Sequence, residues 1–367
     1  MTPINPAFKS DASPGLINWR LRFTEHGPTL IPKHFRNITG IINVSKNNHL
    51  FFGQKYTDLQ PCAKFECDVP TLLQSIMTTY TRIGAVTGAN KGVGLAIVRQ
   101  LTLQYPTSPM NNGPLLLYLT ARNEERGKAA QDAINGDPAV KQAKALRRHG
   151  GLTEIQYHAL DIDDDTSVDR FASFLKEQHP QGIDFLINNA AIAKQGFDNT
   201  VVRDTLHCNY YGTYHAMQRI LPLIKDGGRL VNVASMSGHL NSKYSDSIKS
   251  RFLNATKPED ISQLMEDFTS AVAGGTHEKD WPSSAYAVSK AGLIGLTKVV
   301  ARDHKQAGSK MLINVCCPGY VVTDMTRGGG VKTPDQGAQT PVMLAIQDIH
   351  DTSGEFWQHE KIIDWDK

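Results

Sequence analysis

The chain has 367 residues, of which 40% are hydrophobic and 20% charged, and its formal net charge is +3. That length suits one large domain or two small ones, either of which can bury a core. So small a basic excess, with no visible patch of Lys and Arg, argues against nucleic acid as a partner. No uncharged apolar run approaches the roughly 18 residues that span a bilayer, and the N-terminus lacks a secretory signal. We therefore expect no membrane partner.

The five cysteines are odd in number and widely spread, at Cys62, Cys67, Cys208, Cys316 and Cys317. They form no CxxC pair, and no histidine stands near them at metal-ligand spacing. A reducing compartment is the simplest explanation, so the sequence predicts a cytoplasmic protein without a metal.

From about residue 82 onward, short β-branched runs alternate with longer amphipathic stretches. We expect strands at 82–87, 115–120, 155–160, 185–188, 229–233 and 311–316. We expect helices at 93–105, 123–146, 165–179, 204–223 and 284–304. This alternation is typical of βαβ units, and it predicts an α/β protein with a doubly wound parallel sheet, the Rossmann fold. Ligands bind such sheets at the carboxyl ends of the strands.

Two segments fall outside this rhythm. Residues 241–281 insert a polar, helix-prone segment ahead of the last expected helix. Residues 1–76 show no sustained period of about 2 or 3.6. We therefore expect one Rossmann-type domain over residues 77–367, preceded by a poorly ordered N-terminal extension that is not part of the fold.

The extension has three possible explanations: a mistaken upstream start or retained non-coding sequence in the gene model, an organelle-targeting segment, or an accessory domain. Basic residues outnumber acidic ones up to residue 36, but the Arg- and Ser-rich amphipathic character of a transit peptide is missing. An aperiodic stretch of this length offers few ways to bury a core. A chain that begins at Met77, just ahead of the first expected strand, should therefore fold and keep its function.

Glycines are dense in the stretch TGANKGVG at residues 87–94, which lies between an expected strand and an expected helix. Backbone N–H groups at such a helix start can face an anion, with Gly88 permitting the tight turn. A glycine trio alone is weak, but the strand–loop–helix context favours a phosphate site over a structural turn. The sequence predicts a pyrophosphate cradle made of Gly88, Asn90, Lys91, Gly92, Val93 and Gly94.

The second expected strand ends in Leu119-Thr120-Ala121-Arg122, without the Asp or Glu that binds a ribose 2′-hydroxyl. An Arg at this place suits a 2′-phosphate. With Lys91 inside the glycine loop, two cations could converge on the adenosine end, which favours NADPH/NADP+ over NADH. The alternative is that Arg122 is a solvated residue at a helix start.

Tyr286 and Lys290 stand four residues apart at the head of an amphipathic helix, so they share one face. A phenol with an ordinary pKa of about 10 can donate a proton to a nascent alkoxide. A neighbouring ammonium lowers that pKa. Alone, this pair is more often a solvated helix face than a site.

Two further polar residues accompany the pair. Ser235 follows a buried-strand run and emerges at the carboxyl edge of the sheet, where it can hydrogen-bond a carbonyl oxygen. An ordinary strand-end serine is its alternative explanation. Asn209 falls within a long expected helix, where asparagine is mildly unfavourable, so it either points to solvent or serves a site.

Taken together, these residues resemble the short-chain dehydrogenase/reductase family. The matching set is TGANKGVG, Leu160-Asp161-Ile162, Asn188-Asn189-Ala190-Ala191, Asn209, Ser235, Tyr286-x-x-x-Lys290 and Pro318-Gly319. Within the family the chain is most similar to the monomeric NADPH-dependent carbonyl reductases. That likeness rests on DWPSSAY at 280–286, on CCPGYVVTDM at 316–325 and on the insertion before Tyr286. It covers about residues 81–365.

The resemblance implies a role for each matching residue. Tyr286 would be the general acid, Lys290 would lower its pKa and hold the nicotinamide ribose, and Ser235 would orient the substrate carbonyl. Asn209 would keep a water that connects Lys290 to solvent. The other implied cofactor contacts are Asp161 and Ile162 at the adenine, Asn189 at the adenosine ribose, and Val321 and Thr323 over the nicotinamide. Met236 and Tyr320 would join Ser235 and Tyr286 around the substrate.

Three departures from the family pattern are small. Ala191 replaces a common Gly and Ala234 a common second Ser, and neither removes a needed functional group. Tyr320 stands where some relatives have Trp, which puts the substrate range in doubt but not the reaction type.

The resemblance implies NADPH-dependent reduction of aldehydes, ketones or quinones to alcohols by hydride transfer, without a metal. A dedicated ketone reductase or alcohol dehydrogenase of one biosynthetic pathway is the alternative on the same fold. A third possibility is a nucleotide-sensing or scaffolding protein that has lost the chemistry, and the intact Ser235, Tyr286, Lys290 and Asn209 count against it. We expect a monomer, because residues 241–281 would cover the helix surface that relatives without them use to form tetramers.

Overall fold

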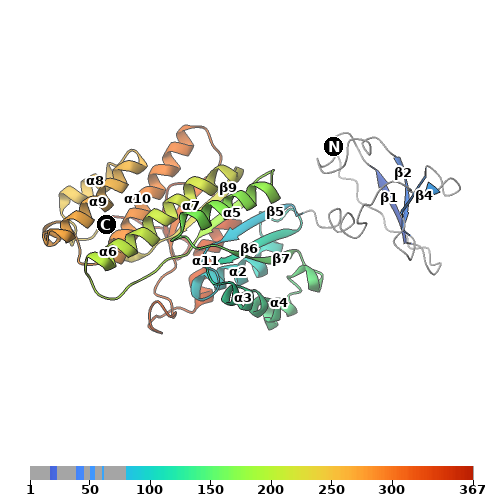
Figure 1. The fold of residues 1–367 in the computed structure, drawn as a ribbon, viewed down its shortest axis with the longest axis horizontal. Helices are drawn as coiled ribbons and strands as arrows, with labels where there is room; N and C mark the ends of the chain where they lie inside the picture. The colour runs from blue at the N-terminus through green and yellow to red at the C-terminus, as the bar shows by residue number, and fades with distance from the viewer. Residues whose placement is uncertain (1–16, 23–38, 45–49, 54–59, 62–79, 367) are drawn as a thin grey trace. The chain divides into compact units, whose positions relative to one another are not determined.

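The computed structural model describes residues 17–22, 39–44, 50–53, 60–61 and 80–366. The chain divides into two compact units, Met1–Thr79 and Tyr80–Lys367. In the first unit, four strands form an antiparallel sheet (Figure 1): β1 (Ile17–Arg22), β2 (Thr39–Val44), β3 (Leu50–Gly53) and β4 (Gln60–Pro61). The sequence did not indicate these strands, none of which is longer than six residues. The rest of this unit, with Cys62, Cys67 and Met77, lies outside the described residues, so the poorly ordered extension stays a prediction.

The second unit is built on one eight-stranded sheet with the order β12-β11-β10-β9-β8-β5-β6-β7. In chain order the strands are β5 (Arg82–Val86), β6 (Leu115–Ala121), β7 (Thr153–Ala159), β8 (Ile183–Asn188), β9 (Ile224–Val233), β10 (Leu312–Cys317), β11 (Phe356–Gln358) and β12 (Lys361–Ile362). All neighbours pair in parallel except β11 and β12. The strand order reverses between β5 and β8, as in a doubly wound sheet, so the predicted fold class is confirmed.

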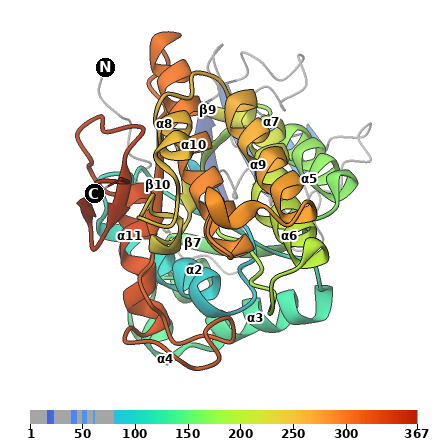
Figure 2. The ribbon, with the colours of Figure 1, turned by 90° about the vertical axis from the view of Figure 1, so that its left-hand side faces the viewer.

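Helices cover both faces of this sheet. They are α2 (Gly92–Gln104), α3 (Glu124–Gly136), α4 (Pro138–Gln142), α5 (Asp165–Gln178), α6 (Asn199–Leu206), α7 (Thr213–Ile220), α8 (Asp246–Leu253), α9 (Pro258–Ala273), α10 (Ala285–Gln306) and α11 (Pro334–Ile346). Figure 2 shows α2, α3 and α11 on one side of the strands, and α5, α7 and α10 on the other.

Alternate strand residues enter two hydrophobic cores, one under each helix layer. In β6, Leu116 and Tyr118 join the core with α5, α7 and α10, whereas Leu115, Leu117 and Leu119 join the core with α2, α3 and α11. Strands β6 and β8 are buried along their whole length. Burial on both faces explains their nearly continuous apolar runs.

The helix expected over 123–146 is broken. Asp137 has φ −58° and ψ 125°, because the following Pro138 disfavours helical geometry in the residue before it. The Asp137 carboxylate instead accepts a hydrogen bond from the N–H of Val140 and caps α4. One long expected helix therefore becomes α3 and α4, and the prediction was wrong at this point.

The inserted segment 241–281 is helical, as predicted. Ser245 caps α8 through a hydrogen bond from the N–H of Ile248. Helix α9 begins with Pro258, and the N–H of the preceding Lys257 donates to the Asp260 carboxylate at 3.1 Å. The buried residues of α9 join the hydrophobic core that also contains the apolar face of α10. These α9 residues are Ile261, Leu264, Met265 and Phe268. The insertion is thus an integral part of this unit.

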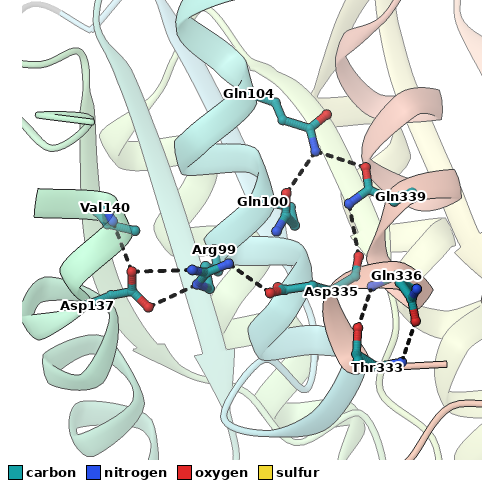
Figure 3. Close-up of polar contacts among 9 residues, drawn as sticks. All are labelled: Arg99, Gln100, Gln104, Asp137, Val140, Thr333, Asp335, Gln336 and Gln339. Atoms are coloured by element: carbon teal, nitrogen blue, oxygen red, sulfur yellow. Dashed lines mark hydrogen bonds and ion pairs between the residues drawn. The ribbon is translucent and has the colours of Figure 1, made fainter. Parts of the chain in front are cut away.

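Polar contacts connect α2 with α4 and α11 (Figure 3). Arg99 of α2 lies 2.9 Å from the carboxylate of Asp137 and 2.8 Å from that of Asp335 in the first turn of α11. Thr333 and Gln336 form the capping box that begins α11. Since α2 follows the glycine loop and α11 follows the segment 318–332, these contacts fix two loops of the candidate site relative to one another.

Candidate active site

The predicted site residues gather at the carboxyl ends of β5, β8, β9 and β10, where the strand order reverses. Open α/β sheets bind their ligands at this place. The site has a glycine loop after β5, an adenosine-side hollow, a group of polar residues at the start of α10, and the loop 318–332 after β10.

The glycine loop depends on residues without side chains. Gly88 has φ +62°, and a Cβ there would lie 2.7 Å from the Cα of Ala190. A Cβ on Gly94 would lie 2.4 Å from the carbonyl oxygen of Gly88. Both positions therefore require glycine, and Gly94 makes room for the loop itself rather than for a ligand.

Helix α2 begins at Gly92, directly after this loop. The preceding Lys91 makes no side-chain cap, and the first turn carries no acidic residue. The N–H groups of a helix's first turn have no partner within the helix and carry partial positive charge. The arrangement of Asn90, Lys91 and Val93 around this helix start suits an anion such as a pyrophosphate.

Asn189, which directly follows β8, stabilises the glycine loop by hydrogen bonds to its backbone. Its side-chain amide donates hydrogen bonds to the carbonyls of Thr87 at 3.0 Å and Gly88 at 3.2 Å. The hydroxyl of Thr87 accepts from the N–H groups of Asn189 and Ala190, each at 3.0 Å. The structure thus gives Asn189 a structural role, and its contact with an adenosine ribose stays a prediction.

A hollow of about 480 Å³ lies among residues that follow β6, β7 and β8. Its lining residues include Arg122, Asp163, Ile192, Lys194, Arg203 and His207. His207 Nδ1 lies 2.8 Å from the Asp163 carboxylate. Arg122 therefore faces a space with room for a nucleotide, whereas Asp163, Arg203 and His207 were missed by the sequence interpretation. Their only sequence signal is their position shortly after strands or on the helix that follows β8.

Two predicted residues take other positions. Ile162 is 5% exposed and belongs to the core with α5 and α7, so its side chain does not line the hollow. Asp161 accepts a hydrogen bond from the N–H of Asp163 at 3.1 Å, and it is Asp163 that lines the space. The contacts of Asp161 and Ile162 with an adenine therefore stay a prediction. Lys91 does not line the hollow with Arg122 either, because its ammonium pairs with Asp324 at 2.7 Å.

Tyr286 and Lys290 lie in the first two turns of α10, which begins where Ser284 caps the N–H of Ala287. Lys290 is 2% exposed and donates a hydrogen bond to the carbonyl of Val233 at 2.9 Å. Its ammonium lies 5.6 Å from the centre of the Tyr286 ring. The two side chains thus share one face of the helix, as the spacing predicted. Lys290 is buried against the end of β9, and Tyr286 is half-buried.

Burial controls both pKa values. It lowers the pKa of Lys290 to about 8, and it raises the pKa of Tyr286 to about 12 together with the nearby Cys317. The hydrogen bond with Ser235 acts on the phenol in the opposite direction. The expected net lowering of the Tyr286 pKa was therefore wrong in this state of the protein. A phenol with this pKa is fully protonated at neutral pH and available as a proton donor.

Ser235 lies between β9 and the short 3₁₀ turn Met236–Gly238, which it caps by accepting a hydrogen bond from the N–H of Ser237 at 3.1 Å. The Ser235 side chain also lies close enough to the Tyr286 phenol to oppose the rise in its pKa. The strand end and the helix start therefore bring together two hydroxyl groups that are 51 positions apart in the sequence.

Asn209 lies in a π-helical turn, His207–Gly212, between α6 and α7. It is fully buried, and its side chain accepts from the N–H of Ile192 at 2.8 Å and donates to the Ile192 carbonyl at 2.9 Å. It also donates to the hydroxyl of Ser289, the neighbour of Lys290, at 3.1 Å. Inserted π turns occur often at functional sites. Asn209 therefore connects the segment after β8 with α10, and its water contact stays a prediction.

The loop after β10 lies next to the glycine loop. A Cβ on Gly92 would lie 3.4 Å from the methyl group of Thr323, and Val321 is 3% exposed. Tyr320 and Met236 are exposed, at 58% and 37%. The predicted nicotinamide contacts are thus close to the cradle, and the predicted substrate contacts are open to solvent.

Among the residues that the structure describes, no group of His, Cys, Asp and Glu could hold a metal ion. Within the same part of the chain, no helix is long and apolar enough to cross a membrane.

Cys208, Cys316 and Cys317 are free thiols in buried positions.

Comparison with known proteins identifies the class to which this fold and site belong. The family model for short chain dehydrogenases matches residues 82–247 and 268–331. The chain belongs to the short-chain dehydrogenase family, and the predicted resemblance is confirmed.

Several named relatives are similar over all or nearly all of their length. NADPH carbonyl reductase 1 of Bos taurus is 36% identical over 300 residues, which cover 79% of this chain and 100% of the relative. The Homo sapiens protein of the same name is 37% identical with the same coverage. The Sus scrofa protein is 38% identical over 301 residues, which cover 79% of this chain and 96% of the relative.

Solved structures agree with the fold. Salutaridine reductase from Papaver somniferum superposes with a TM-score of 0.64 at 24% identity, covering 76% of this chain and 99% of that one. Menthone neomenthol reductase from Mentha piperita gives 0.60 at 24% identity, with 76% and 98% covered. At this identity the likeness concerns the fold alone.

Proposed function

We propose that this protein is an NADPH-dependent reductase that converts aldehydes, ketones or quinones to alcohols. The observation that carries the proposal is the group formed by Tyr286, Lys290 and Ser235 at the carboxyl edge of the sheet, the edge that also carries the glycine loop. The carbonyl reductases of three mammals share 36–38% identity with the chain, and their names state the same cofactor.

The described residues fit a nicotinamide dinucleotide. The uncapped start of α2 suits the pyrophosphate. The turn that leads into this helix requires glycine at position 88, because a Cβ there would lie 2.7 Å from the Cα of Ala190. Arg122 faces the hollow that suits the adenosine end, where an arginine favours a 2′-phosphate. When bound, NADPH supplies the hydride for the carbonyl carbon.

The protein's own residues would bind the carbonyl and deliver the proton. Ser235 and Tyr286 would both donate hydrogen bonds to the carbonyl oxygen, where negative charge develops as the reaction proceeds. Tyr286 would then pass its phenolic proton to that oxygen. The phenolate left behind would be stabilised by the buried ammonium of Lys290, 5.6 Å from its ring centre.

Asn209 would act through structure rather than by touching substrate. It hydrogen-bonds both backbone groups of Ile192, which lines the hollow, and the hydroxyl of Ser289 next to Lys290. A side chain that joins these two segments would keep Lys290 aligned with the cofactor site.

We also propose that the enzyme is a cytoplasmic monomer. Helix α9 packs its buried side against α10 and α6, so this part of their surface is already covered within one chain. Light scattering should give a mass near 40.4 kDa. A mass of a dimer or tetramer would contradict the proposal.

A panel of aldehydes, ketones and quinones tests the main proposal. Substrate-dependent oxidation of NADPH by the unmodified protein supports it, with Tyr286→Phe as the matched inactive control. If no compound of the panel is reduced, and NADPH binds normally, the nucleotide-sensing alternative would gain support instead.

A further inference from the structure

An exposed ion pair connects the glycine loop with the loop after β10. The ammonium of Lys91 lies 2.7 Å from the carboxylate of Asp324, and the two side chains are 60% and 78% exposed. The neighbouring ammonium lowers the pKa of Asp324, so the carboxylate is charged at neutral pH. The two residues are 233 positions apart in the sequence.

The loop holds Asp324 at this place through its own hydrogen bonds. The N–H of Thr323 donates to the hydroxyl of Thr326 at 3.0 Å, and this hydroxyl donates to the carbonyl of Val321 at 2.7 Å. The N–H of Gly328 donates to the carbonyl of Thr323 at 2.9 Å. These bonds form a compact turn on either side of Asp324. The methyl group of Thr323 also lies beside Gly92, so the two loops meet at two adjacent points.

The position of Lys91 next to the start of α2 makes it a natural partner for an anionic cofactor. A phosphate group approaching the loop meets an ammonium that is already paired with a carboxylate. We infer that Asp324 holds Lys91 away from the hollow that Arg122 lines, so that Asp324 competes with the 2′-phosphate of NADPH for Lys91 and thereby sets both the affinity for NADPH and its preference over NADH. This inference rests on the proposed function, since it requires NADPH as the cofactor.

Two consequences follow from the charges. Binding of NADPH weakens the Lys91–Asp324 pair, so part of the attraction between Lys91 and the phosphate is lost in every binding event. The cofactor then leaves more readily than it would from an unpaired lysine. Because both side chains are exposed, the energy at stake is that of a surface ion pair, which corresponds to a change of about 1.5- to 5-fold in a dissociation constant.

The test measures the dissociation constants of NADPH and NADH by fluorescence at low ionic strength, on the full chain. Asp324→Asn keeps the size of the side chain and removes its charge. Asp246→Asn is the matched control, because it removes another exposed carboxylate that pairs with a lysine, Lys249 at 3.2 Å. We expect Asp324→Asn to bind NADPH about 1.5- to 5-fold more tightly than the control, with a smaller change for NADH. The gain should diminish with added salt.

Repeating Asp324→Asn in a Lys91→Met background distinguishes two effects of Asp324. One is competition with the phosphate for Lys91, and the other is direct repulsion between the Asp324 carboxylate and the phosphate. If Asp324 acts by holding Lys91, most of the gain disappears without the lysine. A gain that persists in full would overturn the inference, as would unchanged or weaker NADPH binding by Asp324→Asn. A failure of the proposed function looks different: the unmodified protein would then bind NADPH no better than NADH, which would overturn the proposed cofactor and this inference together.

Discussion

The ammonium of Lys290 lies 5.6 Å from the centre of the Tyr286 ring while it donates a hydrogen bond to the backbone carbonyl of Val233. One turn of α10 separates the two residues, and the end of β9 holds the lysine in place. A buried cation beside a protonated phenol is suited to proton donation, because it stabilises the phenolate more than the phenol.

Removing the phenol's hydroxyl tests this relationship. Tyr286→Phe should lower kcat by about 10²- to 10⁴-fold, because the ring remains and only the proton donor is lost. NADPH binding, measured by fluorescence, should stay within about twofold of the unmodified protein, which excludes misfolding as the cause. Retention of more than about a tenth of kcat would contradict the assignment of Tyr286 as the acid.

The lowered pKa of Lys290 predicts a pH dependence. Its charged form stabilises the phenolate, so kcat/KM should fall as the pH rises through about 8. Tyr286, with a pKa of about 12, stays protonated over this range and would not cause the fall. A profile that is flat up to about pH 10 would show that the charge of Lys290 is not required, because the lysine would be neutral by then.

The same pKa shift affects stability with a definite sign. Folding lowers the pKa of Lys290 from 10.5 to about 8, so between these values the unfolded chain binds the proton and the folded chain releases it. Stability from this group therefore rises with pH from about 8 to 10.5 and is lost as the pH falls through the folded value. The contribution of Lys290 to the thermal midpoint should therefore increase above pH 8. Deprotonation of Lys290 thus cannot lower kcat/KM by unfolding the protein, and thermal unfolding measured at each pH checks this.

Arg122 should determine which cofactor is preferred. Arg122→Asp should raise the KM for NADPH and lower that for NADH, because a carboxylate repels a 2′-phosphate and accepts from a ribose hydroxyl. Arg148→Asp, which makes the same charge change in an exposed 3₁₀ turn, is the control. Equal use of NADPH and NADH by the unmodified enzyme would contradict the prediction that Arg122 favours NADPH.

The sequence predicted local features well and long-range ones poorly. The nearly continuous apolar runs of β6 and β8 reveal buried strands, and Ser235, Tyr286 and Lys290 follow a recognisable strand end or helix start. Helix α11 was missed, because Gly337 and Pro341 argue against a helix locally. In the structure, Gly337 packs so closely that a Cβ would lie 2.6 Å from Val321, so tertiary packing decides the outcome.

Three features of the site have the same long-range origin. The Lys91–Asp324 pair joins loops at opposite ends of the domain sequence, and the hollow beside Arg122 is completed by His207 from a different helix. The raised pKa of Tyr286 results from burial, which no helix spacing reveals. The resemblance to a family predicted which residues form the site. The ion pairs, the burial and the pKa shifts of these residues depend on the folded structure and could not be predicted from the sequence.

The N-terminal unit should be dispensable for catalysis. Residues 80–366 contain both cores and every predicted site residue, and carbonyl reductases of known name align over their entire length with 79% of this chain. A chain that begins at Met77 should therefore keep kcat/KM within about twofold. Insolubility, or a much lower kcat/KM, would show that the first unit contributes to the active fold.

A slightly shorter chain provides the sharper comparison, because Arg82 makes a defined ion pair near the start of the second unit. Arg82 forms an ion pair with Asp184 at 2.7 Å, and the side chain of Asp184 is only 3% exposed. Removing Arg82 takes the guanidinium from this buried carboxylate, which would keep Lys225 and would face the new α-ammonium of Ile83 in place of its amide N–H. A chain that begins at Ile83 should therefore lose about 1–3 kcal/mol of stability relative to the Met77 chain. Thermal midpoints of the two chains measure this difference, and equal values would mean that the fold begins after β5 has started rather than at Arg82.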